Sequence, residues 1–156
     1  MEIAFERNAR VLAPKELIWA EMNSLQSVIN KSPQLIDYTL TGERDARIRS
    51  KLTWGPLKYQ VEGNMTVRQL VPNELLEYSI TLPELGLLYT ATMRITPAGA
   101  PEASLDYVAR LELNHRLATK LRGLFSELIE EHIHGLVGRV KTRAEQRRLA
   151  DERLLT

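Results

Sequence analysis

The sequence contains no cysteine, and this absence removes several kinds of chemistry at once. Disulfide bonds, thiolate metal sites and cysteine nucleophiles are all excluded. The lack of cysteine also fits a reducing compartment, and the N-terminus MEIAFERNARV has no apolar core of a secretory signal, so we expect a cytoplasmic protein. No apolar run approaches the roughly 20 residues that a membrane-spanning helix needs, so we expect no membrane span.

A strong net charge is also lacking, because 21 lysines and arginines nearly balance 20 aspartates and glutamates, which leaves +1. Such a chain has no overall field that would attract it to nucleic acid or to a membrane. The basic segment RVKTRAEQRR, residues 139–148, includes a glutamate and lacks aromatic residues, so we expect no nucleic-acid binding. The sequence has no glycine-rich phosphate loop and no internal repeat, and its 156 residues suit one compact domain.

What the sequence does contain is a long series of alternating apolar and polar residues, which is typical of half-buried strands. The first such segment covers about residues 3–11. Six more follow at intervals of roughly a dozen residues, and this pattern predicts an antiparallel meander with one covered face and one face exposed to water. The six are expected at about residues 35–43, 46–56, 57–70, 75–82, 86–97 and 103–114.

Segments whose sequence pattern predicts helices lie before and after this meander. Pro14 suits the first turn of a short helix that ends near residue 22, and Ser24 could begin a second short helix over residues 25–30. From about residue 116 to 150, apolar residues recur every three or four positions, which predicts a long amphipathic helix. Its charged end, residues 143–156, is expected to be a helical tail that projects into solvent, frays or meets a partner, and a homodimer is one possibility.

These elements together predict an α+β domain over residues 1–142, because one apolar helix face must cover one apolar sheet face. A curved seven-stranded antiparallel sheet would wrap around the long C-terminal helix, with two short helices after the first strand. A single helix is too thin to fill such a concave surface, so we expect a ligand cavity between the sheet and the helix.

Three parts of the sequence carry a family resemblance: the segment VLAPKELIWAEM, the middle segment LTWGPLKYQVEGNMTVRQLVPNELLEY and the closing helix. They resemble the START-like superfamily, also called SRPBCC, whose fold is the helix-grip fold. The superfamily includes polyketide cyclase/dehydrase proteins and a family of carbon monoxide dehydrogenase subunits. The resemblance implies a START-like ligand-binding domain for a small hydrophobic or aromatic molecule, lipid or polyketide-like, with no cofactor. It carries no universal catalytic residue to this chain, because the superfamily mixes binders and enzymes.

The five tyrosines are the most informative residues, because the alternation of the strands places all of them on the covered face. A buried phenol hydroxyl without a partner costs about 1–3 kcal/mol, so a core made only for packing prefers other residues. One interpretation is a cavity lined with rings whose hydroxyls meet water or ligand; the other is ordinary core tyrosines whose hydroxyls reach the rim. The candidate ligand-binding residues are Tyr38, Ser50, Trp54, Tyr59, Met65, Tyr78, Tyr89, Met93, Tyr107 and Phe125.

Two histidines in SELIEEHIHGLVGRV raise the question of a metal site. His132 and His134 point about 200° apart on a helix and cannot bind one ion together, so we expect no metal. His132 lies in the apolar stripe, where it could be a general acid or base, or a core histidine hydrogen-bonded to a tyrosine. Strand alternation places Arg7 inward, where it could bind an acidic group, unless its side chain extends to solvent or pairs with a glutamate.

Two functions from different classes follow from these candidates. The first is binding of a small hydrophobic or aromatic ligand in the predicted cavity. The alternative is an enzyme of the polyketide cyclase/aromatase or dehydratase type, with His132 as acid/base and Arg7 or a tyrosine polarising a carbonyl group. A third possibility is an interaction module that docks through the charged tail.

Overall fold

The computed structural model describes residues 2–22, 35–54, 56–99, 101–113 and 122–155. The predicted second short helix, residues 25–30, lies outside the described residues. No helix in the described part of the chain is both long and apolar enough to cross a membrane. The elements are β1 (Glu2–Val11), α1 (Lys15–Met22), β2 (Leu35–Leu40), β3 (Asp45–Trp54), β4 (Leu57–Val71), β5 (Leu75–Leu82), the short 3-10 helix η1 (Pro83–Leu85), β6 (Leu87–Pro97), β7 (Ala103–Leu113) and α4 (Arg122–Leu155).

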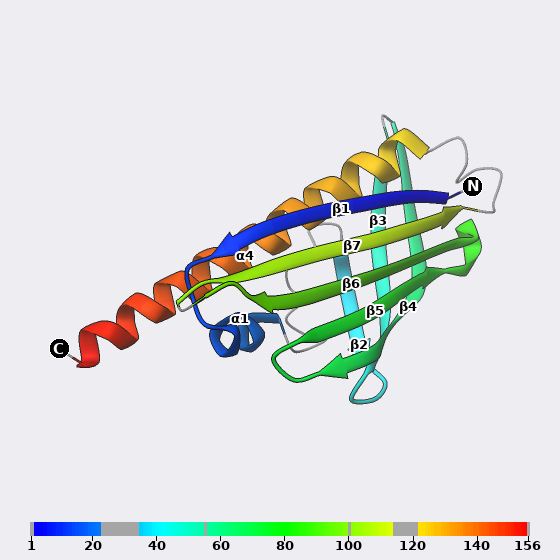
Figure 1. Cartoon of the computed structure of the whole chain (residues 1–156). Coiled ribbons are helices and arrows are strands. Elements are labelled where there is room, and N and C mark those ends of the chain that lie inside the picture. Colours follow the sequence, from blue (N-terminus) through cyan, green and yellow to red (C-terminus); the bar gives the residue numbers. More distant parts are fainter. Residues whose placement is uncertain (1, 23–34, 55, 100, 114–121, 156) are drawn as a thin grey trace.

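The seven strands form one antiparallel sheet in the order β1-β7-β6-β5-β4-β3-β2. Strands β2 to β7 are a meander of neighbours, and β1 closes the sheet by pairing with β7. The sheet is strongly curved, so β2, β3 and β4 run across the direction of β1 and β7, while α4 extends alongside β1 (Figure 1). The predicted fold class, a curved antiparallel sheet with a long C-terminal helix, is confirmed.

The alternation that predicted the strands separates the two faces of the sheet. On β6, for example, Tyr89, Ala91 and Met93 are buried, whereas Arg94 on the other face is exposed. The apolar side of α4 joins this inner face and completes a single core. The buried helix residues are Phe125, Ile133, Leu136, Val137, Val140 and Ala144.

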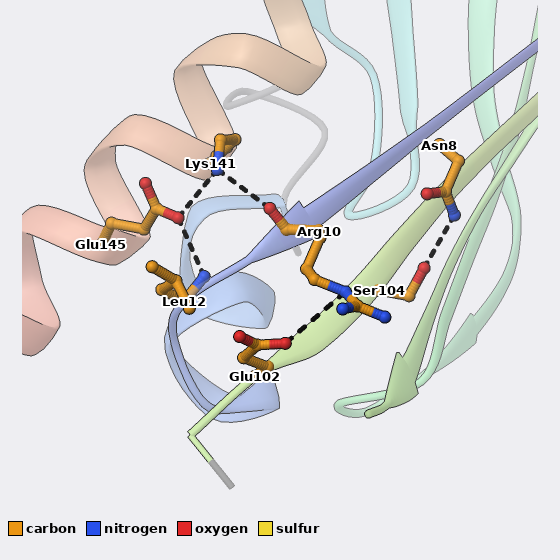
Figure 2. A network of polar contacts seen from close by, with 7 residues as sticks. All are labelled: Asn8, Arg10, Leu12, Glu102, Ser104, Lys141 and Glu145. Atoms are coloured by element: carbon orange, nitrogen blue, oxygen red, sulfur yellow. Dashed lines mark hydrogen bonds and ion pairs between the residues drawn. The ribbon is translucent and has the colours of Figure 1, made fainter. Parts of the chain in front are cut away.

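A polar clamp fixes α4 to the point where β1 ends (Figure 2). The ammonium group of Lys141 donates to the carbonyl oxygen of Arg10 at 2.9 Å and to the carboxylate of Glu145 at 2.9 Å. The same carboxylate accepts the backbone N–H of Leu12 at 2.8 Å. Burial opposes the charge of Glu145, but the Leu12 hydrogen bond and the nearby Lys141 outweigh it and hold the pKa below its ordinary value. The clamp therefore sets the position of the helix along the edge strand.

Beyond the clamp, α4 continues without a break through the segment predicted as a tail. Ala144 is fully buried, and Arg143 and Arg147 approach the carboxylate of Glu21 on α1 at 4.0 and 3.7 Å. The last turns extend past the sheet, where Leu154 is 85% exposed (Figure 1). The division of the chain at residue 142 into a domain and a tail stays a prediction.

Gly63 lies on the inner face of β4, where two strands approach unusually closely. A Cβ atom at this position would lie 2.0 Å from the carbonyl oxygen of Thr81 and 2.6 Å from the side chain of Leu82 on β5. The nearer of these atoms belongs to the backbone and cannot move without disturbing the β4–β5 pairing. Glycine is therefore required for this part of the curved sheet.

We expect the substitution Gly63→Ala to lower the free energy of unfolding by about 2–3 kcal/mol, because overpacking against backbone forces the strands apart. Urea denaturation monitored by circular dichroism measures this loss. Gly138→Ala is the matched control: its added Cβ meets nothing within 4 Å on the exposed side of α4. Alanine there should raise stability by about 0.5–1 kcal/mol. Equal effects of the two substitutions would contradict the steric explanation.

Candidate functional site

The hydroxyl groups of three inner-face tyrosines meet at one point in the core. The Oη atom of Tyr107 on β7 lies 2.5 Å from that of Tyr78 on β5 and 2.5 Å from that of Tyr89 on β6. Tyr78 Oη is also 3.3 Å from Nε2 of His132 on α4. The order of contacts is Tyr89, Tyr107, Tyr78, His132, and we call this set the tyrosine–histidine chain. It joins three neighbouring strands to the helix that covers them.

Strand register and two small residues explain why the three rings converge. Tyr78 pairs with Ala91 on β6, and Ala91 pairs with Ala109 on β7. Both alanines are buried on the inner face, two residues after a tyrosine along the same strand. Their short side chains leave room for rings from β5, β6 and β7, and the Tyr78 and Tyr89 rings lie 6.3 Å apart at a 60° tilt. The sequence pattern did not single out these alanines, although they alternate with tyrosines along β6 and β7.

The hydrogen bonds of the tyrosine–histidine chain can run in more than one direction. Either hydroxyl of the Tyr78–Tyr107 and Tyr89–Tyr107 pairs can be the donor, and a side-chain hydrogen bond also relates Tyr78 to Tyr89. Each hydroxyl has one proton to donate. In one arrangement, Tyr78 donates to Nε2 of a neutral His132, Tyr107 donates to Tyr78 and Tyr89 donates to Tyr107. This arrangement leaves no hydroxyl proton of the three tyrosines without an acceptor.

All four side chains of the tyrosine–histidine chain are neutral at pH 7. Burial raises the pKa of Tyr78, Tyr89 and Tyr107 well above the ordinary value of 10, and the mutual hydrogen bonds do not offset this. Burial also lowers the pKa of His132 from 6.5 to about 4, because the charged imidazolium loses solvation. The site therefore offers uncharged donors and acceptors, which suits a carbonyl or hydroxyl oxygen better than a strong charge.

The other predicted site residues fall into distinct groups. Ser50 and Tyr38 are partly buried, and Tyr38 lines a small pocket at the β2–β3 edge that the tyrosine–histidine chain does not share. The side chains of Trp54 and Tyr59 lie outside the described residues. Arg7 pairs in register with Tyr107, but its side chain is exposed. Residues buried as the alternation predicted are Met65, Tyr78, Tyr89, Met93, Tyr107 and Phe125.

His132 and His134 behave as the helical wheel predicts. His132 is partly buried and faces the sheet, whereas His134 is exposed. The hydrogen bond between His132 and Tyr78 is the one expected if His132 is a core histidine that binds a tyrosine. In the part of the chain that the structure describes, no three histidine, aspartate or glutamate side chains form a group that could hold a metal ion.

Comparisons with known proteins identify solved structures that share this architecture. No family model and no curated protein sequence matches the chain. Solved structures do match it, among them Zhui aromatase/cyclase from Streptomyces sp. R1128, at a TM-score of 0.68 and 14% identity over 94% of this chain and 96% of that one. The di-domain aromatase/cyclase StfQ from the steffimycin biosynthetic pathway matches at 0.69 and 13% identity, with coverage of 94% of this chain and 52% of that chain.

Norcoclaurine synthase from Thalictrum flavum also matches, at a TM-score of 0.58 and 12% identity over 88% of this chain. The chain has the helix-grip fold of these proteins. This chain spans about half the length of StfQ and nearly the full length of the Zhui enzyme. At these identities the helix-grip match establishes the shared fold, and the chemistry has to be argued from the residues of this chain.

The lowered pKa of His132 predicts how stability depends on pH. Between pH 6.5 and about 4 the unfolded chain binds a proton at this residue that the folded chain does not. Stability is therefore lost as the pH falls through this window, by up to about 3 kcal/mol, and this contribution is constant above it. Urea denaturation from pH 8 to 4 should show a steeper loss for the wild type than for His132→Gln. The matched control His134→Gln, at an exposed position, should keep the wild-type slope.

Proposed function

We propose that this protein binds a small, largely apolar or aromatic molecule that carries an oxygen atom, between the inner face of the sheet and α4. The tyrosine–histidine chain is the observation that supports the proposal. Phenylalanine at positions 78, 89 and 107 would fill similar volume without any need for hydrogen-bond partners. Four polar groups placed together in an otherwise apolar core match the pattern of a ligand site, in which a few polar groups orient an apolar molecule.

The residues around the tyrosine–histidine chain suit such a ligand. Met65 and Met93 are buried on the same inner face, and methionine side chains adapt to ligands of irregular shape. Charged residues are nearly absent from this face of β5, β6 and β7, so a charged ligand would be poorly solvated there. The aromatase/cyclases and norcoclaurine synthase that share the fold point to aromatic or polyketide-like molecules as the class to test first.

Two naphthalene derivatives, 2-acetylnaphthalene and 2-ethylnaphthalene, test this proposal as model aromatic ligands. We expect both to bind one molecule per chain, measured by native mass spectrometry and by a rise in the melting temperature. Ala91→Leu should weaken binding at least tenfold, because the larger side chain would displace the tyrosine rings that pack beside Ala91. Ala4→Leu, at an exposed position of β1, is the matched control and should bind normally. If neither compound binds the wild type, the proposed ligand class is wrong.

The second candidate is an enzyme of the polyketide cyclase/aromatase or dehydratase type. Its support is the pair formed by Tyr78 and His132, since a neutral imidazole beside a phenol can accept and return a proton. A pKa near 4 makes His132 a weak base, and Tyr78 already occupies its Nε2 atom. Arg7, exposed on the edge strand beside Tyr107, would polarise a carbonyl group only for a substrate that reaches the rim.

A linear poly-β-ketone thioester is the substrate with which to test the enzyme. If His132 is the acid/base, kcat/KM should rise with pH through about 4 and stay constant from pH 6 to 8, because His132 is then fully neutral. His132→Gln should abolish cyclisation, measured by liquid chromatography of the products, while His134→Gln keeps the wild-type rate. Cyclisation at an unchanged rate in His132→Gln would exclude this residue as the acid/base.

A further inference from the structure

A small hollow lies where β2, β3 and β4 run side by side. It has a volume of about 40 Å³ and is lined by Tyr38, Thr39, Arg47, Ile48, Arg49 and Glu62. Tyr38 and Ile48 pair in register and belong to the inner face, since Ile48 is buried and Tyr38 packs against the core. The other four residues alternate with them and are exposed on the outer face. Polar and charged side chains therefore surround the hollow.

One of the two arginines, Arg49, has acidic residues opposite it on both sides. It pairs in register with Asp37 on β2 and with Glu62 on β4. Opposite charges on directly paired positions of a sheet attract each other. The positive charge of Arg49 is therefore balanced within the sheet.

The other arginine, Arg47, has no such balance. It projects from the same face of β3 as Arg49, and the residues opposite it are Thr39 on β2 and Asn64 on β4, which are both uncharged. Within the part of the chain that the structure describes, Arg47 makes no hydrogen bond or ion pair. The hollow therefore has one guanidinium group whose charge and N–H donors are available to a ligand.

We propose that this hollow binds the carboxylate group of a small molecule, and that Arg47 is the residue that recognises it. A guanidinium group is planar and donates two parallel N–H bonds to the two oxygens of a carboxylate. Thr39 lies directly opposite, and its hydroxyl group donates a third bond. A hollow of about 40 Å³ accommodates the carboxylate group, and the rest of the molecule extends into solvent.

Charge favours a carboxylate over a phosphate group. A carboxylate carries one negative charge, which matches the single unbalanced charge of Arg47. A phosphate group carries more than one negative charge at pH 7, and the carboxylate of Glu62 in the wall would repel the excess. The hollow lies on the opposite face of the sheet from the tyrosine–histidine chain, so this site is independent of the proposed function.

Acetate is the probe that tests the site. We expect 1H–15N NMR of the full-length chain at pH 7 to show saturable shifts of the backbone amide signals of Thr39, Arg47 and Arg49 when sodium acetate is added. Sodium chloride and sodium phosphate at the same ionic strength are the comparisons. Chloride should give small shifts that do not saturate, and phosphate should bind more weakly than acetate.

Three variants identify the residue responsible. Arg47→Gln should weaken acetate binding at least tenfold, because a charge-assisted bidentate contact is lost. Lys51→Gln removes the same charge from the same face of β3, about 13 Å along the strand from Arg47 and outside the hollow. It should weaken binding by no more than about twofold, because salt screens charges at that distance. Glu62→Gln should strengthen binding about threefold, because a repelling charge is removed.

The wild-type titration decides the matter even if a variant folds poorly. If acetate and chloride produce the same shifts without saturation, the hollow is not a carboxylate site. Tighter binding of phosphate than of acetate would contradict the ligand class. Equal losses in Arg47→Gln and Lys51→Gln would show that general charge attracts the anion, and the role of Arg47 would be wrong.

Discussion

A buried hydroxyl group needs a hydrogen-bond partner, and this requirement governs the centre of the structure. Tyr107 is completely buried between Tyr78 and Tyr89, and its hydroxyl group is a hydrogen-bond partner for the hydroxyl groups of both. His132 completes the set from the helix. Because the partners come from β5, β6, β7 and α4, a single chain of polar contacts links the covering helix to the middle of the sheet.

Two features far from the tyrosines hold the strands and α4 where the tyrosine–histidine chain can form. Gly63 permits the close approach of β4 and β5 where the sheet curves. Lys141 and Glu145 bind the backbone at the end of β1 and so fix the position of α4 along its length. With the helix held at that end, His132 on the same rigid element faces Tyr78. The clamp in Figure 2 and the tyrosine–histidine chain are thus two parts of one arrangement.

The helix-grip fold and the function of this chain are separate questions. Proteins with this fold include aromatase/cyclases and a norcoclaurine synthase, at sequence identities of 12–14%. The core of this protein holds a neutral polar array in which burial lowers the pKa of His132 to about 4. Such an array is better suited to hydrogen bonding with an uncharged oxygen than to strong general-base catalysis, which is why binding is the first proposal and an enzyme the second.

The sequence by itself determined the strands, the long helix and the face on which Tyr78, Tyr89 and Tyr107 lie, because alternation with a period of two and a helical period are local properties. It also determined that His132 faces the core and that His134 does not. It left open whether the tyrosine hydroxyls meet each other, because that depends on the register between strands and on the small residues Ala91 and Ala109. Only the tertiary structure decided that Tyr107 bridges two tyrosines, and that Arg7, inward by alternation, has an exposed side chain on an edge strand.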